Sequence, residues 1–348
     1  FISSPRGGKL FEDLRMKGLT VHHTTIAGEP SPEIIDDIVA RFSGTPPDSV
    51  TGIGGGSVID AGKAVSAMLK TGGSVRDYLE VVGTREHPGD KVPFAAVPTT
   101  SGTGSEATKN AVISSVGKSG FKRSLRHDNF VPDVAVVDPE LTIICPPEIT
   151  AAAGMDCFTQ LTEAYLSVKA CEMSDALAVE GLKAVRESLI RSFTNGDDPD
   201  ARSGMSFAAL MSGICLANAG LGTVHGIAGT IGALSGIPHG VVCGTLMASA
   251  NEINIRELRR TGSNPDALRR YAALGRIFAD AEFKPDDYYI DFFEDYLNAV
   301  TYRLRLPRLG DYGLRPEDAD EIVSQSDNKN NPVFLSEELM KEIILKRI

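Results

Sequence analysis

Three residues after position 147 have side chains of the types that bind divalent metal ions, namely Asp156, His225 and His239. A carboxylate and two imidazoles together suit Fe(II), Zn(II) or a similar ion. Asp156 and Gln160 are four residues apart, so on a helix they share one face, which Glu163 continues. These residue types are compatible with a metal site on one helix, completed by two histidines from elsewhere in the chain.

Both histidines lie in segments of small residues, 223–226 and 237–240, where the backbone can pack closely or leave room for a ligand. Taken singly, a histidine is more often a structural residue with satisfied hydrogen bonds than a metal ligand. The spacing of the three residues is not by itself a metal-binding signature. On the residues alone, the metal and structural interpretations both stay open.

A glycine run, Gly54-Gly55-Gly56, follows one apolar segment and precedes a helical pattern that starts at Ser57. Glycines let backbone N–H groups approach a pyrophosphate, and the N-terminus of a helix favours negative charge. The alternative is a tight strand-to-helix turn with Ser57 as its N-cap. The run matches neither the GxGxxG fingerprint nor a Walker loop.

A second polar loop, residues 98–106 with the sequence Pro-Thr-Thr-Ser-Gly-Thr-Gly-Ser-Glu, follows another apolar segment. Ligands bind at the carboxyl ends of strands in open α/β sheets, so the two loops together predict a nucleotide site. A solvated connection is the alternative. Lys122 could meet a phosphate or a ribose as a point charge, although a lone lysine is more often solvated.

These loops require a parallel sheet to position them. Between residues 9 and 138, short apolar runs alternate with helical patterns, as in a doubly wound α/β sheet with helices on both faces. Ser31 and Pro32 should open one helix as N-cap and first-turn residue. The expected strands are 19–25, 49–53, 93–97 and 134–137, and the expected helices include 8–16, 31–42 and 57–69.

The residue composition of the sequence changes after Pro146 and Pro147. From residue 148 onward Ala, Leu, Glu and Arg dominate and strand-like runs become rare, which predicts a helical domain. We therefore place an α/β dinucleotide-binding domain at residues 1–146 and a helical metal and substrate domain at residues 147–348. A ligand is expected in the cleft between them, with walls from Phe158 and residues 213–218 and 328–332.

The start of the chain bears on whether the α/β domain is complete. The printed chain begins at Phe1 rather than with Met and runs directly into an apparent turn at residues 5–8. We therefore expect the first strand of the α/β domain to be missing from it.

Composition narrows the classes of protein. The 348 residues are 42% hydrophobic and 23% charged, enough for one large or two ordinary globular domains. A net charge of −11 without a basic run argues against nucleic-acid binding. No apolar stretch reaches the roughly 18 residues of a membrane span, so no membrane partner is expected. The five cysteines are scattered without a CxxC pair, which indicates small core residues in a reducing, cytoplasmic compartment.

Taken together, six segments closely resemble the iron-containing (group III) alcohol dehydrogenase family. They are residues 54–60, 98–106, 138–141, 154–156, 222–226 and 238–240, and their order and spacing match the family across nearly the whole chain. The resemblance implies the dehydroquinate synthase-like fold of these enzymes. That fold combines an N-terminal α/β dinucleotide-binding domain, an all-helical C-terminal domain and a divalent metal in the cleft between them.

The resemblance also assigns residues to roles. Asp156, His225 and His239 would hold the metal and form the catalytic centre. The residues implied for cofactor binding are Gly55, Gly56, Ser57, Asp60, Thr99, Thr100, Thr103 and Lys122. NAD and NADP are both compatible with the chain, because the acidic residue that would select between them should lie at or before Phe1. Association into a homodimer or a higher homo-oligomer is expected as well.

Two positions depart from the family pattern. Gln160 stands where the family usually has a fourth metal ligand, a histidine, and a neutral amide oxygen is a poorer ligand for Fe(II) or Zn(II). The metal is therefore expected to be weaker, different or absent. Gly229 stands where a second histidine often lies near the nicotinamide, so no proton relay can run through that position.

The implied function is an NAD(P)-dependent oxidoreductase acting on CH–OH groups, which transfers hydride between nicotinamide and an alcohol or aldehyde with Fe or Zn in the cleft. Gln160 keeps open a metal-independent reductase resembling the maleylacetate reductases, with His225 or His239 as proton donor. A non-catalytic nucleotide-binding module is a further alternative. Relatives such as glycerol dehydrogenase and dehydroquinate synthase share the architecture, but the loop at 98–106 fits the alcohol dehydrogenases better.

Overall fold

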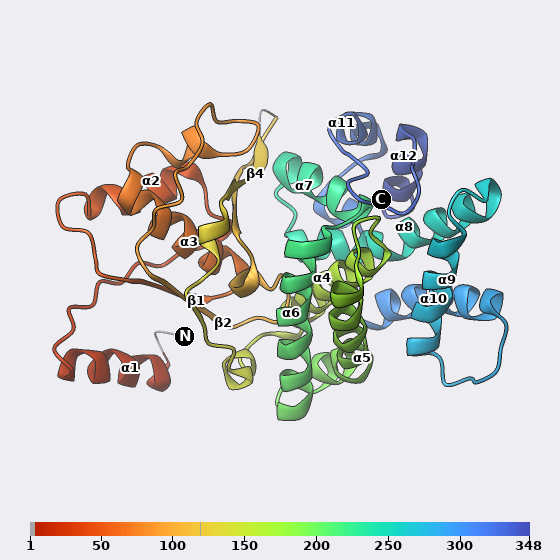
Figure 1. Ribbon diagram of the computed structural model, residues 1–348, viewed down its shortest axis with the longest axis horizontal. Helices are drawn as coiled ribbons and strands as arrows, with labels where there is room; N and C mark the ends of the chain where they lie inside the picture. Colours follow the sequence, from red (N-terminus) through yellow and green to blue (C-terminus); the bar gives the residue numbers. More distant parts are fainter. Residues whose placement is uncertain (1–3, 119) are drawn as a thin grey trace.

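A small parallel sheet forms the centre of the first part of the chain, and a bundle of helices forms the second part. The computed structural model describes residues 4–118 and 120–348. In Figure 1 the sheet and its helices, coloured red to yellow, lie beside the green and blue helices of the second part. The predicted division into an α/β part followed by a helical part is confirmed.

The parallel sheet has the strand order β1-β2-β5 among the described residues, with β1 (Val50–Gly54), β2 (Phe94–Pro98) and β5 (Val134–Ala135). Its register pairs Val50 with Phe94 and Gly54 with Pro98, so β1 and β2 end at the same edge. Two of the expected strands are thus confirmed to within one residue. The one expected at 134–137 is shorter than predicted.

The helices of the first part are α1 (Pro5–Met16), α2 (Pro32–Arg41) and α3 (Gly56–Thr71). Helix α2 begins as expected, since the Ser31 hydroxyl accepts a hydrogen bond from the Ile34 N–H and Pro32 occupies the first turn. Its apolar face, including Ile35 and Ile38, packs into a core shared with α3 and the antiparallel hairpin β3 (Asn110–Ser115) and β4 (Phe121–Arg126).

One expected strand is wrong. Residues 19–25 form no strand, although Leu19 and Val21 alternate with polar residues. A strand needs a neighbour to share its backbone hydrogen bonds, and alternation alone reports only a tendency. The β3–β4 hairpin was conversely not expected, although Phe121 and Leu125 point their side chains into the core.

The second part is helical throughout the described residues. Its α-helices are α4 (Pro147–Leu166), α5 (Glu172–Thr194), α6 (Pro199–Ala219), α7 (Thr223–Ser235), α8 (His239–Thr261), α9 (Pro265–Phe278), α10 (Asp286–Arg303), α11 (Ala319–Ser324) and α12 (Glu337–Leu345). Short 3₁₀ helices lie in both parts of the chain. Those of the first part are Val75–Tyr78, Ser105–Ala107, Asp128–Phe130 and Pro139–Thr142, and those of the second part are Leu309–Tyr312 and Pro316–Asp318.

Helix α4 lies at the centre of the bundle, where it contacts α5, α6 and α8 (Figure 1). Every residue from 154 to 164 is buried, including four polar ones in the stretch from Asp156 to Thr162. A helix that is covered on all sides belongs to the core, so its polar residues must find partners inside the protein. This burial is what makes the polar face of α4 a candidate site.

Phe158 was expected to line the cleft between the two parts, and this prediction is wrong. Its ring is fully buried and packs against Phe278 and Phe293, with centroid distances of 5.0 and 6.3 Å. Aromatic rings at these separations stabilise a core. Phe158 therefore anchors α4 to α9 and α10.

No single helix in the described part of the chain has both the length and the apolar composition of a membrane span. Helices α6 and α7 pass that composition test only as a pair, and the pair is bent by 101°.

A buried lysine ties α3 to the second polar loop. Lys63 is fully buried, and its ammonium donates to the backbone oxygens of Ser105, Thr108 and Asn110 at 2.8 to 2.9 Å. Burial lowers the pKa of Lys63 to about 8, against the opposing effect of Asp60 at 3.9 Å. One carbonyl of the loop, at Ser105, and two carbonyls between the loop and β3, at Thr108 and Asn110, therefore depend on one side chain of α3.

We predict that Lys63→Met lowers the free energy of unfolding by about 3 kcal/mol, because it leaves these buried carbonyls without a donor. Lys70→Met, at an exposed position on the same helix, is the matched control and should change it by less than about 0.5 kcal/mol. Denaturant unfolding followed by circular dichroism measures both. Equal midpoints for the two variants would contradict this role of Lys63.

Candidate functional site

Three helices bring the predicted metal ligands together. Asp156 comes from the middle of α4, His225 from the first turn of α7, and His239 is the first residue of α8. With Cys243, these residues offer four ligand atoms that all lie within 4.8 Å of one another. His225 Nε2 lies 3.2 Å from Asp156 Oδ1, and His239 Nε2 lies 3.9 Å from the same oxygen.

A carboxylate from α4 fixes the orientation of His225. Glu163 accepts a hydrogen bond from the Val224 N–H at 2.7 Å through Oε1. Its other oxygen, Oε2, lies 2.6 Å from His225 Nδ1. With Nδ1 held by this carboxylate, Nε2 is the nitrogen that faces Asp156 and is free to bind a cation. The sequence placed Glu163 on this face of α4 without indicating its partner.

His239 reaches the group because α8 begins against the backbone of α4. A Cβ at Gly240 would lie 2.6 Å from the Ala152 carbonyl oxygen, a separation that real Cβ atoms do not show. Any side chain there would push the start of α8, and His239 with it, away from Asp156. Glycine at position 240 is therefore required for His239 to approach Asp156 closely.

The electrostatics of the group come from burial and mutual charge. Burial raises the pKa of Asp156, but the two histidines outweigh it and the pKa is lowered. Burial and the nearby Lys122 ammonium lower the pKa of His239 to about 4. Burial also acts to lower the pKa of His225, but Cys243, Glu163 and Asp156 outweigh it, so that pKa is raised well above the ordinary value.

Gln160 lies one turn after Asp156 on α4 and is almost completely buried. Its Oε1 atom has no hydrogen-bond partner among the described residues. A buried amide oxygen without a donor is costly, and a cation or an unplaced ligand atom is the kind of partner that would relieve it.

Cys243 is the residue of this group that the sequence analysis missed. It lies one turn after His239 on α8, and its Sγ is 3.5 Å from His225 Nε2 and 3.6 Å from His239 Nε2. The four-residue spacing from His239 was the available signal, but it needed the knowledge that α8 begins at His239. Cys145, Cys157 and Cys215 are buried as expected, whereas Cys171 is exposed.

The two glycine-containing loops start side by side at the carboxyl edge of the sheet. The Thr99 N–H donates to the Gly54 carbonyl at 2.9 Å, which joins the ends of β1 and β2. Helix α3 begins at Gly56 with Gly55 as an N-cap that provides no side chain. The residues predicted to contact a cofactor here are all partly accessible, namely Gly55, Gly56, Ser57, Thr99, Thr100 and Thr103.

The other two predicted cofactor residues make contacts within the protein. Asp60 Oδ1 accepts from the Ser105 hydroxyl and Oδ2 accepts from the Val112 N–H at 3.0 Å. Lys122 forms an ion pair with Glu29 and is only 8% exposed in its side chain, so the solvated interpretation of this lysine is wrong. Cofactor contacts by Asp60 and Lys122 stay predictions.

The second loop also contacts α4, the helix that carries Asp156. A Cβ at Gly102 would lie 3.0 Å from Ala153 Cβ, and the Gly102 carbonyl accepts from the Ser212 hydroxyl of α6 at 3.3 Å. Gly240 lies against Ala152 and Ala153 of the same turn of α4. The second loop and the start of α8 therefore meet on one turn of α4, the turn that precedes Asp156.

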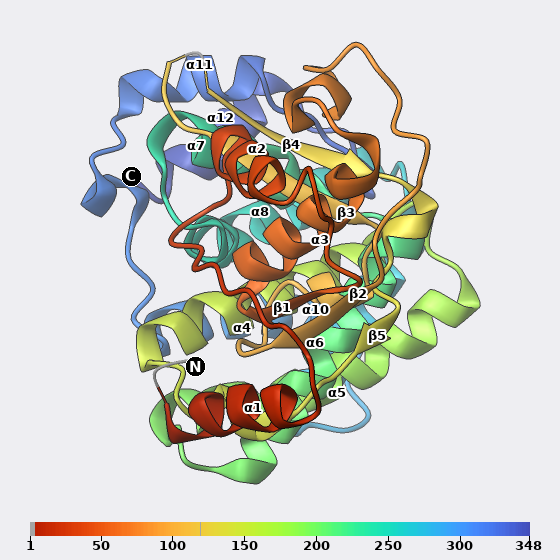
Figure 2. The same ribbon diagram turned by 90° about the vertical axis from the view of Figure 1, so that its left-hand side faces the viewer.

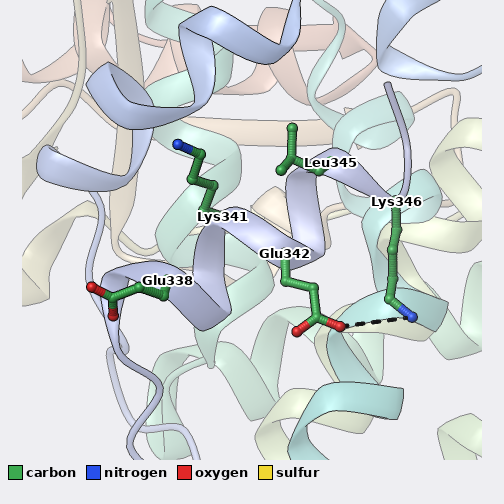
Figure 3. Close-up of a pocket in the computed structure, with 5 residues that line it drawn as sticks. All are labelled: Glu338, Lys341, Glu342, Leu345 and Lys346. Atoms are coloured by element: carbon green, nitrogen blue, oxygen red, sulfur yellow. Dashed lines mark ion pairs between the residues drawn. The ribbon is translucent and has the colours of Figure 1, made fainter.

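A separate surface groove lies along α12, and Figure 3 shows the side chains that line it. They are Glu338, Lys341, Glu342, Leu345 and Lys346, and the dashed line marks the Glu342–Lys346 ion pair at 4.0 Å. None of the predicted site residues lines this groove. Exposed ion pairs of this kind contribute little to stability or binding.

Two family models match nearly the whole chain. The model described as iron-containing alcohol dehydrogenase matches residues 3–139. The model described as the C-terminal part of the Fe-containing alcohol dehydrogenase family matches residues 150–348. The matched regions contain both glycine loops and all four members of the metal-ligand group.

Similar proteins agree with these matches. Long-chain-alcohol dehydrogenase 1 of Geobacillus thermodenitrificans is 40% identical over 65% of the chain, and the match covers 57% of that relative. NAD-dependent methanol dehydrogenase of Bacillus methanolicus is 35% identical over 68% of the chain and 63% of its own length. The chain thus spans less than two thirds of either relative. Among solved structures, an alcohol dehydrogenase from Oenococcus oeni has a TM-score of 0.88 at 27% identity, covering 100% of this chain and 90% of that one.

The Glu163 contacts generate a prediction. Glu163→Gln should weaken Zn(II) or Fe(II) binding by about 10- to 100-fold, because an amide no longer holds His225 through a charged hydrogen bond. Glu148→Gln, at an exposed position on the same helix, is the matched control and should leave the affinity unchanged. Titration with a competing chelator measures both constants. The role assigned to Glu163 fails if the two variants bind metal equally well.

Proposed function

Because the chain belongs to the iron-containing alcohol dehydrogenase family, we propose that it transfers hydride between a nicotinamide dinucleotide and an alcohol or aldehyde. The observation that carries the proposal is the meeting of two sites on one turn of α4. The loop 98–106 lies against Ala153, and the start of α8, which bears His239, lies against Ala152 and Ala153. A nucleotide bound at the loops and a cation bound at the helices would therefore be neighbours.

The residues present fit a divalent cation. Asp156, His225 and His239 supply one carboxylate oxygen and two imidazole nitrogens within a sphere that one ion can bridge. The unpartnered Oε1 of Gln160 adds a buried acceptor beside Asp156 on the same helix face. Bound there, such a cation supplies Lewis-acid polarisation of an alcohol or carbonyl oxygen.

The residues also fit a dinucleotide. A Cβ at Gly56 would lie 2.7 Å from Thr103 Oγ1, so only glycine leaves the two loops in this close arrangement. The uncapped start of α3 presents backbone N–H groups and the positive end of the helix dipole, which suit a pyrophosphate. Thr99, Thr100 and Thr103 add hydroxyl groups at the same edge. NAD is the cofactor named for the methanol dehydrogenase relative, and we propose NAD ahead of NADP for this chain.

Asp156, Glu163, His225 and the two glycine-containing loops each have a defined part in the proposed reaction. A bound nicotinamide would accept hydride from the carbinol carbon or donate it to a carbonyl carbon, and the hydroxyl proton would be exchanged with solvent. Asp156 brings negative charge to the group, and Glu163 keeps His225 Nε2 turned toward it. The two loops would hold the dinucleotide in a fixed position beside the cation group, which lowers the entropic cost of the reaction. No side chain is required as the immediate base, which agrees with glycine at position 229.

We place the protein in a reducing compartment such as the cytoplasm. All five cysteines lie among the described residues and carry free thiols, as is usual where disulfides do not persist. Self-association into a homodimer or a larger homo-oligomer stays a prediction, which light scattering at several concentrations would test.

The dinucleotide cradle generates one prediction. Gly56→Ala should weaken NADH binding by about 10-fold, since the added methyl displaces Thr103 from the loop. Gly8→Ala, at an exposed helical position with open space around it, is the control and should leave binding unchanged. Fluorescence titration with NADH gives both constants. Unchanged binding in Gly56→Ala would place the cofactor elsewhere.

The metal group generates another prediction. Protein purified without chelator should carry about one equivalent of Fe or Zn, and removing it should reduce NADH-dependent aldehyde reduction by on the order of 1,000-fold. His239→Asn should lose both the metal and the activity, whereas His22→Asn, an exposed histidine, should keep both. Activity that persists without metal would instead support a metal-independent reductase with a histidine as proton donor.

A further inference from the structure

Cys243 is placed as a ligand rather than as a filler of the core. Its side chain is fully buried at the end of the first turn of α8. Its sulfur faces the Nε2 atoms of both His225 and His239, at 3.5 and 3.6 Å.

Three distances between the donor atoms agree with the edges of a tetrahedral site, and a fourth, from His239 to Asp156 at 3.9 Å, is longer than such an edge. With a metal–sulfur bond of about 2.3 Å and metal–nitrogen bonds of about 2.05 Å, the edge between sulfur and nitrogen is about 3.6 Å. The two observed edges are 3.5 and 3.6 Å. An edge between nitrogen and oxygen in such a site is about 3.3 Å. His225 and Asp156 are 3.2 Å apart across that edge, and His239 and Asp156 are 3.9 Å apart.

The chemistry of the donors favours Cys243 over Gln160. A neutral amide oxygen is a weak ligand for Fe(II) or Zn(II), whereas a thiolate is a strong one and brings a second negative charge to the site. The sulfur also lies beside both imidazoles, as a ligand sharing their cation must.

We propose that the Cys243 thiolate is the fourth protein ligand of the cation, in the role that the family pattern gives to a histidine at position 160. The ligand set becomes one carboxylate, two imidazoles and one thiolate, which directs the site toward Zn(II) rather than Fe(II). The S–H proton passes to solvent as the metal–sulfur bond forms, and no oxidant or reductant is needed. Zinc accommodates a fifth donor during turnover, so four protein ligands do not close the site to substrate.

This inference rests on the proposed function only in requiring that a divalent cation binds at the Asp156, His225, His239 and Cys243 group. Its test is the absorption spectrum of the full chain loaded with one equivalent of Co(II). A thiolate bound to Co(II) gives a charge-transfer band in the near ultraviolet, which oxygen and nitrogen ligands do not give. The unaltered protein should show this band, so the central result does not depend on whether a variant folds.

Two cysteine variants make the assignment specific. Cys243→Ser should abolish the band and weaken Zn(II) binding by about 100-fold. Loss of a residue that only hydrogen-bonds a metal ligand weakens binding by about 10- to 100-fold, and loss of a ligand should cost at least as much. Cys171→Ser removes the exposed thiol, which is the one most available to stray metal, and should keep the band and the affinity. Gln160→Ala should keep the band as well.

The outcomes separate this inference from the proposed function. If Co(II) binds without a thiolate band and aldehyde reduction still requires metal, Cys243 is not a ligand and the proposed function stands. A band that survives in Cys243→Ser but disappears in Cys171→Ser also overturns the inference. If neither Co(II) nor Zn(II) binds, both this inference and the metal-dependent function are wrong.

Discussion

The hydrogen-bonded contact between Glu163 and the start of α7 is the interaction on which the candidate site depends. One carboxylate holds the Val224 N–H and His225 Nδ1, so it fixes both the position of the helix and the direction of the imidazole. Because residues 154–164 of α4 are buried, Glu163 cannot turn toward solvent to satisfy its charge. The helix that carries Asp156 thus also orients the histidine that completes the group.

The α/β part reaches this centre through its second loop, which polar contacts from α3 hold in place. Helix α3 begins at the first glycine loop and holds the second loop through Lys63 and Asp60. Figure 2, turned by 90° from the first view, again shows α3 next to β1 and the helical part behind them. The second loop in turn rests on Ala153 of α4. A series of contacts therefore runs from the first glycine loop to the turn of α4 that precedes Asp156.

Local signals in the sequence predicted the parts of the fold that local chemistry determines. The strands at β1 and β2, the cap at Ser31 and the glycine loops follow from residue types close together in the chain. The failures concern partners far apart in sequence. Residues 19–25 lack a neighbouring strand, the β3–β4 pairing was not foreseen, and the contacts of Glu163 and Cys243 depend on where α7 and α8 pack. His225 and His239 drew attention in the sequence because the chain has only six histidines, and Asp156 because it opens the polar face of its helix.

Anomalous X-ray diffraction from crystals of the metal-loaded protein with NADH tests the central claim most directly. Data collected on both sides of the zinc and iron absorption edges locate and identify the ion. The account predicts one strong peak within bonding distance of Asp156, His225 and His239, with the nicotinamide ring beside it. A peak elsewhere, or density for NADH with no anomalous signal at these residues, would contradict it.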